Sequence, residues 1–250
     1  MDKQSSKSNT FIEPAIEMSE GDGVDVNRLF PVSSKRMNFD PFVLWDNFNI
    51  GPDRGFPTHP HRGFEAITYM FTGSIEHKDN LGNHSTVTSG GAQRFTAGRG
   101  IEHSEMPDSQ NMSNGIQLWI NLPKSLKSIE PDYQQVDKEN IPVKDIAGGR
   151  VSTIVGDDSP VKLKTPVRYL EVNLEKTAEL VENVPDDFRG FIYLLNGQLK
   201  VNNETMNPRE AFFFENIKAL DIEALTESRF MLCMGKPHRE PILQYGPFVD

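Results

Sequence analysis

The chain has 250 residues, a formal net charge of −10 and a single cysteine, Cys233. Its length and its 36% of apolar residues allow a packed core in one large domain or in two of about 120 residues each, and they argue against a disordered chain. The acidic charge, without a Lys/Arg cluster beyond pairs such as Lys35-Arg36, argues against direct nucleic-acid binding. One cysteine cannot form an intrachain disulfide, which fits a reducing compartment, and we expect Cys233 to be buried in an apolar strand.

The N-terminal residues 1–9 are polar, and the sequence shows neither a secretion signal nor a membrane span. We therefore expect a cytoplasmic protein with a flexible tail over residues 1–20. From Val24 onward, short apolar segments alternate with glycine and proline turn signals; examples are residues 42–45, 66–71, 92–96 and 115–120. These segments are rich in β-branched and aromatic residues, which predicts an all-β protein.

The strand pattern breaks between Leu122 and Pro142, where prolines interrupt a polar stretch. We interpret this stretch as the start of an inter-domain connection, although residues 133–136 keep a strand pattern. A second β-rich block runs over residues 166–235, and the proline-rich residues 236–250 are expected to pack back across the surface. The predicted domains therefore span residues 21–145 and 146–250.

Two segments look like copies of one unit. Residues 68–76 align with residues 192–200 at an offset of 124, and each has a strand, a polar residue, a glycine and a second strand. The glycines are Gly73 and Gly197, and the pair Asn196-Gly197 is typical of a tight hairpin because both residues tolerate positive φ. The repeat favours a duplicated β-barrel domain over one large sandwich.

Two spaced pairs of metal-ligand residues occur in the first half of the chain. His59 and His61 are two residues apart, as are His103 and Glu105. Residues two apart on a strand point to the same face, so each pair can direct both side chains into a barrel. An isolated His-x-His pair often arises by chance on a surface, but two such pairs favour a metal site. Three imidazoles and a carboxylate suit Fe(II), Mn(II), Ni(II) or Zn(II), with open positions for oxygen chemistry.

The second copy lacks these ligand residues. At the same offset, His59 and His61 align with Asn183 and Pro185, and His238 is the only histidine after residue 103. We therefore expect a second barrel without a metal. Glu65, which follows His61 by four residues, is a further candidate ligand by spacing.

The motifs His59-Pro-His61-Arg-Gly-Phe-Glu65 and Ala97-Gly-Arg-Gly-Ile-Glu-His103-Ser-Glu105-Met-Pro resemble the paired signatures of the pirin family. Other segments similar to landmarks of that family are residues 40–42, 81–83, 117–123 and 245–249. The resemblance implies a bicupin, with two stacked antiparallel barrels of the cupin (double-stranded β-helix, or jelly-roll) type in one chain. It also implies one Fe(II), with Mn, Ni, Zn or Cu as substitutes, in the N-terminal barrel only.

The resemblance also implies which residues hold the ion. It assigns the ligands to His59, His61, His103 and Glu105, and it places Glu65 outside the ligand set as a supporting neighbour. Arg62 and Arg99 lie beside the ligands in sequence. They either neutralise carboxylates or position a substrate in the pocket, or they form salt bridges that support turns.

Four further residues receive a less specific interpretation. His77 is expected at a strand surface and His84 in or beside a turn, both without a metal role. Trp45 and Trp119 are expected in the core, with the pocket mouth as the alternative.

Some pirin-family members open the ring of quercetin with O₂ and release carbon monoxide, so the resemblance implies an iron-dependent flavonol dioxygenase. A metal ion would lower the pKa of the flavonol 3-hydroxyl, and Glu105 is the natural catalytic base for its proton. Other members bind a transcription factor or a metabolic enzyme. The alternative is therefore a non-enzymatic, redox-sensitive regulatory protein, and a sugar-isomerase-type cupin is a weaker third hypothesis. We expect a monomer.

Overall fold

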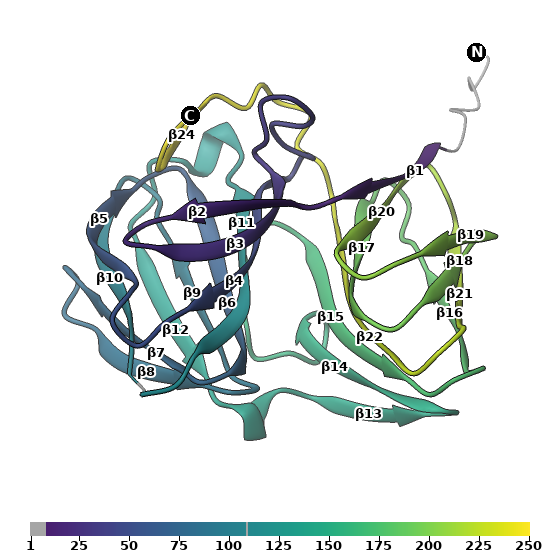
Figure 1. The fold of residues 1–250 in the computed structure, drawn as a ribbon. Helices are drawn as coiled ribbons and strands as arrows, with labels where there is room; N and C mark the ends of the chain where they lie inside the picture. Colours follow the sequence, from purple (N-terminus) through teal and green to yellow (C-terminus); the bar gives the residue numbers. More distant parts are fainter. Residues whose placement is uncertain (1–8, 109) are drawn as a thin grey trace, which may run out of the picture. The chain divides into compact units, whose positions relative to one another are not determined.

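The computed structural model describes residues 9–108 and 110–250 (Figure 1). Residues 1–8 of the predicted tail lie outside the described part. The described residues form strands and loops with two short 3₁₀ helices, η1 (Lys124–Leu126) and η2 (Lys138–Asn140), which confirms the all-β prediction. None of the described helices is long and apolar enough to cross a membrane.

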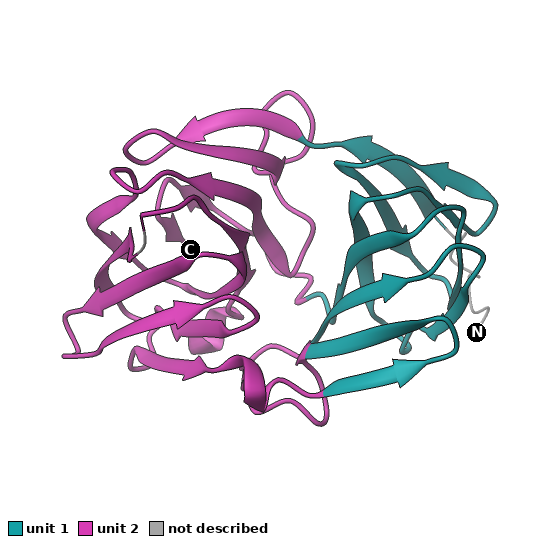
Figure 2. Ribbon diagram, turned by 60° about the horizontal axis from the view of Figure 1, so that its bottom comes forward, with its two compact units in different colours: residues 1–15, 143–153, 167–237 teal, residues 16–142, 154–166, 238–250 magenta. Residues whose placement is uncertain are grey.

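The chain divides into two compact units, each built from antiparallel sheets (Figure 2). The N-terminal barrel, as we call it, consists of residues 16–142, 154–166 and 238–250. The C-terminal barrel consists of the described residues up to 15 together with 143–153 and 167–237. Two cupin-type barrels were predicted and are present, but each takes segments from both sides of the expected boundary at residue 145. The proline-rich end of the chain belongs to the N-terminal barrel.

The N-terminal barrel has two main sheets and a short hairpin. The seven-stranded sheet has the order β12 (Asp132–Val136), β9 (Ala92–Thr96), β6 (Phe64–Thr72), β11 (Ser113–Asn121), β4 (Phe42–Ile50), β3 (Val24–Phe30) and β2 (Ile16–Glu20). The four-stranded sheet has the order β5 (Phe56–His61), β10 (Ile101–Pro107), β7 (Ser74–Asp79) and β8 (His84–Thr88). The hairpin consists of β23 (Gln244–Tyr245) and β24 (Phe248–Val249). Strand β12 includes residues 133–136, which keep a strand pattern in the sequence within the stretch interpreted as a connection.

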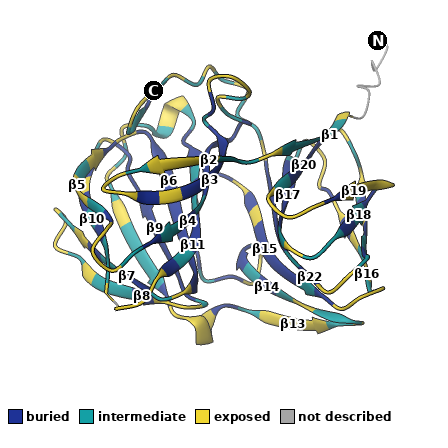
Figure 3. Ribbon diagram, in the orientation of Figure 1, coloured by how far each residue is buried: buried dark blue, intermediate teal, exposed yellow. Residues whose placement is uncertain are grey.

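The C-terminal barrel repeats this arrangement. Its seven-stranded sheet has the order β1 (Asn9–Pro14), β20 (Glu210–Glu215), β17 (Arg189–Asn196), β22 (Ser228–Gly235), β15 (Val167–Leu174), β14 (Gly149–Val155) and β13 (Val143–Ile146). Its four-stranded sheet has the order β16 (Glu179–Asn183), β21 (Ala219–Ala224), β18 (Leu199–Val201) and β19 (Glu204–Met206). Buried apolar side chains fill the interior, and buried stretches of these strands are dark blue in Figure 3. Cys233 is buried in β22, as predicted.

Residues 9–20 do not form a tail, contrary to the prediction. Strand β1 pairs with β20 along its whole length, and β2 pairs with β3. Phe11 stacks on Phe213 with 5.0 Å between the ring centroids. These strands are short and flanked by polar residues, so the sequence gives only a weak strand signal. The edge of an existing sheet supplies the backbone hydrogen bonds that stabilise them.

The internal repeat has the same turn geometry in both barrels. Gly73 and Gly197 adopt φ angles of 72° and 89°. A Cβ atom at these positions would lie 2.4 Å and 2.3 Å from the hydroxyl oxygens of Ser113 and Ser228. Each of these serines accepts a hydrogen bond from the backbone N–H after the glycine, at 3.1 Å in both cases. Both turns therefore need glycine for the backbone conformation and for space.

Candidate metal centre

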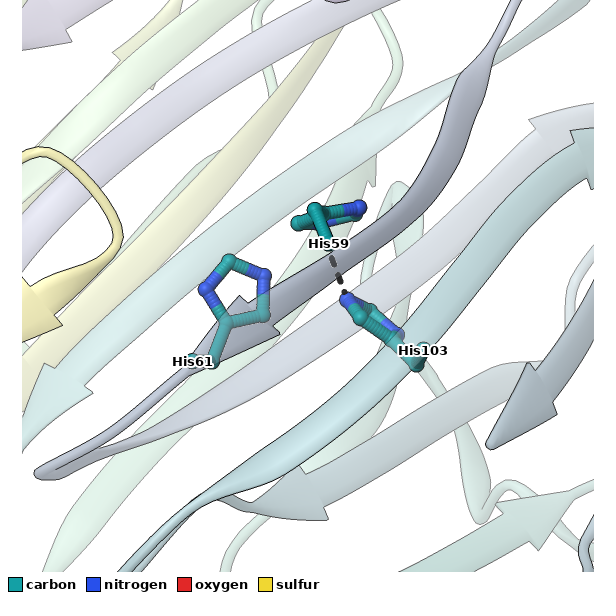
Figure 4. Close-up of side chains that lie close together, drawn as sticks. All are labelled: His59, His61 and His103. Carbon is teal, nitrogen blue, oxygen red and sulfur yellow. Dashed lines mark hydrogen bonds between the residues drawn. The ribbon is translucent and has the colours of Figure 1, made fainter. Parts of the chain in front are cut away.

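Strands β5 and β10 carry the histidines of the predicted ligand pairs into the N-terminal barrel. Along β10, Ile101, His103 and Glu105 are buried while Glu102 is exposed. Strand β5 pairs antiparallel with β10 so that His59 lies opposite His103. The period of two therefore brings the imidazoles together from neighbouring strands, as Figure 4 shows.

The three imidazoles converge on one point. Nε2 of His103 lies 3.2 Å from Nε2 of His59. The ring centroid of His61 lies 4.6 Å from that of His59 and 4.9 Å from that of His103. One nitrogen of each ring lies within 4.8 Å of the other two. Two nitrogens bound at about 2.1 Å to one ion are about 3 Å apart, so this spacing fits a shared divalent cation.

The surroundings keep two of the imidazoles neutral, which is the form that binds metal ions. Burial, followed by the charge of His59, lowers the pKa of His61 to about 3. Burial and the neighbouring histidines lower the pKa of His103 well below its usual value. Nδ1 of His59 donates to the carbonyl oxygen of Pro57 at 2.7 Å, so in the neutral form of this ring the lone pair is on Nε2.

The Glu105 carboxylate is buried and is held by three hydrogen-bond donors, which we call the donor row. Oε1 accepts from the Thr68 hydroxyl at 2.9 Å and from the Gln93 amide at 2.6 Å. Oε2 accepts from the Gln117 amide at 3.0 Å. These bonds fix the orientation of the carboxylate and leave acceptor capacity on both oxygens.

The donor row runs across three neighbouring strands, since Thr68 of β6 pairs with Gln93 of β9 and Gln117 of β11. At the offset of the internal repeat, Thr68 corresponds to Ile192 of β17, which pairs with Phe212 of β20 and Leu232 of β22. These three side chains belong to the apolar core of the C-terminal barrel. The same framework therefore carries a polar row in one barrel and an apolar row in the other.

His77 was expected at a strand surface, and this prediction is wrong. The side chain is fully buried, and its ring stacks on Tyr133 with 4.2 Å between the centroids. One nitrogen of His77, one of His103 and a carboxylate oxygen of Glu105 form a second group within 4.8 Å. Because Glu105 joins this group rather than that of the three ligand histidines, its role as a fourth ligand stays a prediction. The spacing His77-x-Asp79, the same as in the two ligand pairs, was the overlooked signal.

Glu65 holds the 154–166 segment in place and belongs to neither group of candidate ligands. Its carboxylate accepts from the Thr96 hydroxyl at 2.9 Å and from the backbone N–H groups of Lys164 and Thr165 at 2.9 and 3.3 Å. Burial is the main cause that raises the pKa of Glu65. These contacts give Glu65 a structural role in the barrel.

The two arginines beside the ligand motifs form surface ion pairs. Arg62 binds Asp250 at 2.9 Å, and Arg99 binds Glu130 at 2.8 Å. Exposed pairs of this kind typically contribute about 0–1 kcal/mol, so they support the chain ends and turns rather than a buried site. His84, at the start of β8, is exposed and contacts Glu76 at 2.7 Å.

A cavity of about 490 Å³ adjoins the histidines. His59, His61 and Glu105 all line it, which brings the carboxylate and two of the histidines to one solvent space. Apolar side chains form much of its wall, among them Leu44, Phe48, Phe56 and Trp119. Trp119 therefore lines the pocket, whereas Trp45 is fully buried in the core.

A buried ion pair forms another part of the cavity wall. Arg28 of β3 lies opposite Asp46 of β4 and binds it with two hydrogen bonds of 2.8 and 2.6 Å. Glu20 accepts a third bond from Arg28 at 2.5 Å. Burial, more than any other cause, raises the pKa of Asp46. With two carboxylates and one guanidinium, this wall favours ligands that donate hydrogen bonds over anionic ligands.

Two antiparallel cupin-type barrels, one with a histidine cluster beside a cavity and the other with an apolar interior, define the chain as a bicupin. Family models described as "Pirin" and "Pirin C-terminal cupin domain" match residues 23–120 and 169–250. The chain is 37% identical to "Pirin" of Homo sapiens over an alignment of 256 residues, covering 98% of this chain and 88% of that protein. It is also 37% identical to "Pirin-like protein 2" of Arabidopsis thaliana, covering 98% of this chain and 82% of the relative. The chain belongs to the pirin family, as its motifs predicted.

Solved structures agree with this assignment. The quercetin 2,3-dioxygenase of Acinetobacter baumannii is 28% identical, with a TM-score of 0.87, covering 96% of this chain and 90% of that chain. The protein GK1651 of Geobacillus kaustophilus is 29% identical, with a TM-score of 0.85, covering 94% and 98%. The bicupin fold is therefore shared along nearly the whole chain.

Proposed function

We propose that the chain is an iron-dependent dioxygenase that cleaves flavonols such as quercetin with O₂. The observation that carries the proposal is a single cavity that combines His59, His61 and Glu105 with apolar walls. The similarity to a quercetin 2,3-dioxygenase supports the choice of substrate class. A cavity of about 490 Å³ is within the usual range for small-molecule sites of about 300–1,000 Å³.

The donor set fits a divalent transition metal. Imidazole nitrogens from His59, His61 and His103 lie within 4.8 Å of one another, and Glu105 supplies a carboxylate at the same cavity. Such ligands suit Fe(II), and also Mn, Ni, Zn or Cu. When bound, the ion supplies Lewis acidity toward a substrate hydroxyl and the redox capacity that reaction with O₂ requires.

The protein residues bind and orient the flavonol. The apolar wall around Leu44, Phe48 and Trp119 packs against the aromatic rings and excludes water. Glu20 and Asp46 accept hydrogen bonds from phenolic hydroxyls remote from the reacting ring. Glu105 takes the proton of the flavonol 3-hydroxyl onto a carboxylate oxygen, because the donor row holds that oxygen in a fixed direction.

The test is an anaerobic reconstitution with Fe(II), followed by addition of O₂ and quercetin and measurement of quercetin absorbance. At matched iron content, Glu105→Gln should lower the rate by about 10²- to 10⁴-fold, the usual contribution of a general base. Glu65→Gln is the matched control, since Glu65 binds Thr96 and the 154–166 segment, and it should change the rate much less. Absence of turnover of quercetin and related flavonols by iron-replete protein would refute the proposal.

A regulatory protein is the second candidate, and the C-terminal segment favours it. Pro247 and Gln244 line the cavity beside the histidines, while the neighbouring Leu243 and Tyr245 are 53% and 67% exposed. Nδ1 of His61 faces the carbonyl oxygen of Pro247 at 3.4 Å, so a candidate ligand contacts a segment with exposed apolar side chains. A pull-down that compares Fe(II) with Fe(III) protein tests this function. Equal capture of partners in both oxidation states, unaffected by Tyr245→Ser, would refute it.

A further inference from the structure

Three buried side chains form a line behind the metal-binding face of His103. Oδ2 of Asp79 lies 3.0 Å from Nε2 of His77. Nδ1 of His77 lies 3.4 Å from Nδ1 of His103. The side chains of Asp79 and His77 have no solvent exposure. The line Asp79–His77–His103 therefore connects the carboxylate at the end of β7 to a candidate metal ligand through direct contacts.

The hydrogen bonds of Asp79 set the direction of this line. Besides His77, the Asp79 carboxylate accepts from the backbone N–H of Leu81 and from the backbone and side-chain N–H groups of Asn83. The carboxylate is an acceptor only, so neutral His77 donates from Nε2 and keeps its lone pair on Nδ1. The contact between the two Nδ1 atoms then requires His103 to donate, which leaves the lone pair of His103 on Nε2.

We propose that Asp79 and His77 are positioning residues that fix the tautomer of His103, so that its Nε2 lone pair is directed at the metal site. In neutral His59 the lone pair is also on Nε2, because Nδ1 of this ring donates to Pro57. With these tautomers, two lone pairs face each other over the 3.2 Å contact that Figure 4 marks with a dashed line. Two acceptors at this distance repel each other, and a cation that both nitrogens bind turns the repulsion into attraction. The line Asp79–His77–His103, which we call the relay, thus prepares the site for a metal ion.

Tyr133 holds this relay in place. Its ring stacks on His77 with 4.2 Å between the centroids and an interplanar angle of 17°. Its hydroxyl donates to Oε1 of Gln93 at 3.2 Å, and Gln93 in turn donates to Glu105. One aromatic side chain therefore supports the partner of His103 and a donor to Glu105. Supports of this kind behind metal ligands typically change metal affinity by about 10- to 100-fold.

Substitutions at His77 separate this role from a purely structural one. His77→Phe keeps a ring that stacks on Tyr133 but removes the acceptor for His103. His77→Asn places a carbonyl oxygen near the position of Nδ1 and restores that acceptor. We expect His77→Phe to weaken Zn(II) and Fe(II) binding by about 10- to 100-fold and to raise the Fe(III)/Fe(II) potential, because the ligand becomes less electron-rich. His77→Asn should recover most of both, and His84→Phe is the exposed control.

Two results would overturn the relay. Affinity and potential equal to wild type in His77→Phe would show that the relay has no effect on the ion. Loss of the ion in both His77→Phe and His77→Asn would make His77 a ligand instead. The relay rests on the metal site of the proposed function but not on its substrate, so these readouts stay informative if quercetin is not consumed.

A measurement on the unmodified protein covers the case in which His77→Phe does not fold. Nitrogen-15 NMR of the metal-free, histidine-labelled protein distinguishes the two neutral tautomers. We expect His103 to carry its proton on Nδ1 and His77 to carry its proton on Nε2. A proton on Nε2 of His103 would refute the proposed direction.

Discussion

The donor row around Glu105 leads to a prediction about stability that needs no metal. Glu105→Gln and Glu105→Leu both remove the carboxylate charge, so the desolvation of that charge cancels when the two variants are compared. They differ in what they offer to the amides of Gln93 and Gln117, which both donate to Glu105. In Glu105→Leu both amides lose this acceptor and keep only the Thr68 hydroxyl, at 3.4 Å from Gln93 and 3.2 Å from Gln117. Gln117 also lines the cavity, so the larger loss falls on the buried Gln93, where an unsatisfied donor costs about 1–3 kcal/mol.

The glutamine variant retains these hydrogen bonds through a rotation of one neighbour. With its carbonyl oxygen toward Gln93, the new amide nitrogen would face the amide nitrogen of Gln117. Oε1 of Gln117 is buried and has no hydrogen-bond partner among the described residues. A 180° flip of the Gln117 amide therefore converts a donor–donor contact into a hydrogen bond. We expect Glu105→Gln to be more stable than Glu105→Leu by about 1–3 kcal/mol, the cost of one unsatisfied buried amide.

Urea unfolding of the metal-free variants, followed by tryptophan fluorescence, measures this difference. The two tryptophans of the chain, Trp45 and Trp119, both belong to the N-terminal barrel, so the signal reports the barrel that contains Glu105. Gln117→Leu in the Glu105→Gln background is the control, because it removes the group that flips. Equal free energies of unfolding for Glu105→Gln and Glu105→Leu would contradict the reasoning.

Three further predictions follow from the site. His103→Ala should remove most of the bound metal and His84→Ala should not; full metal stoichiometry by elemental analysis of folded His103→Ala protein would sink the ligand assignment. In metal-free protein the folded-state pKa of His61, about 3, lies below its ordinary value of 6.5, so the unfolded chain binds a proton that the folded chain does not. Stability should fall as the pH drops below about 6.5, by about 2 kcal/mol at pH 5 from His61, and an unfolding profile from pH 7 to 5 that is the same in wild type and His61→Phe would contradict this. Anomalous scattering from metal-loaded crystals should show no ion held solely by residues of the C-terminal barrel.

The period of two along a strand was the most informative signal in the sequence. It predicted that His59 and His61, and likewise His103 and Glu105, share a face, and β10 shows this alternation of burial. The glycine turns at Gly73 and Gly197 were predictable because the conformation they require is local. Features determined by neighbouring residues were therefore accessible without a structure.

Contacts between distant segments were not accessible in this way. His77 lies between Glu76 and Lys78, so its sequence neighbours suggest a surface strand, but Tyr133 covers it from 56 residues away. The contact between His61 and Pro247 spans 186 residues. Charged sequence neighbours describe only one face of a strand, whereas burial of the other face depends on which strand packs against it.

The difference between the two barrels is an argument for a bound ligand. Apolar side chains fill the C-terminal barrel, with Ile192, Phe212 and Leu232 at the positions of the donor row. The N-terminal barrel instead buries Glu105 and His103, the latter with a strongly lowered pKa, and burial of such groups opposes folding. Stability alone would favour the apolar interior, since both barrels have the same strand arrangement. A cation that binds the facing nitrogen lone pairs explains the polar interior. Desolvation of these groups destabilises the folded state, and binding of the ion to the folded state offsets this cost.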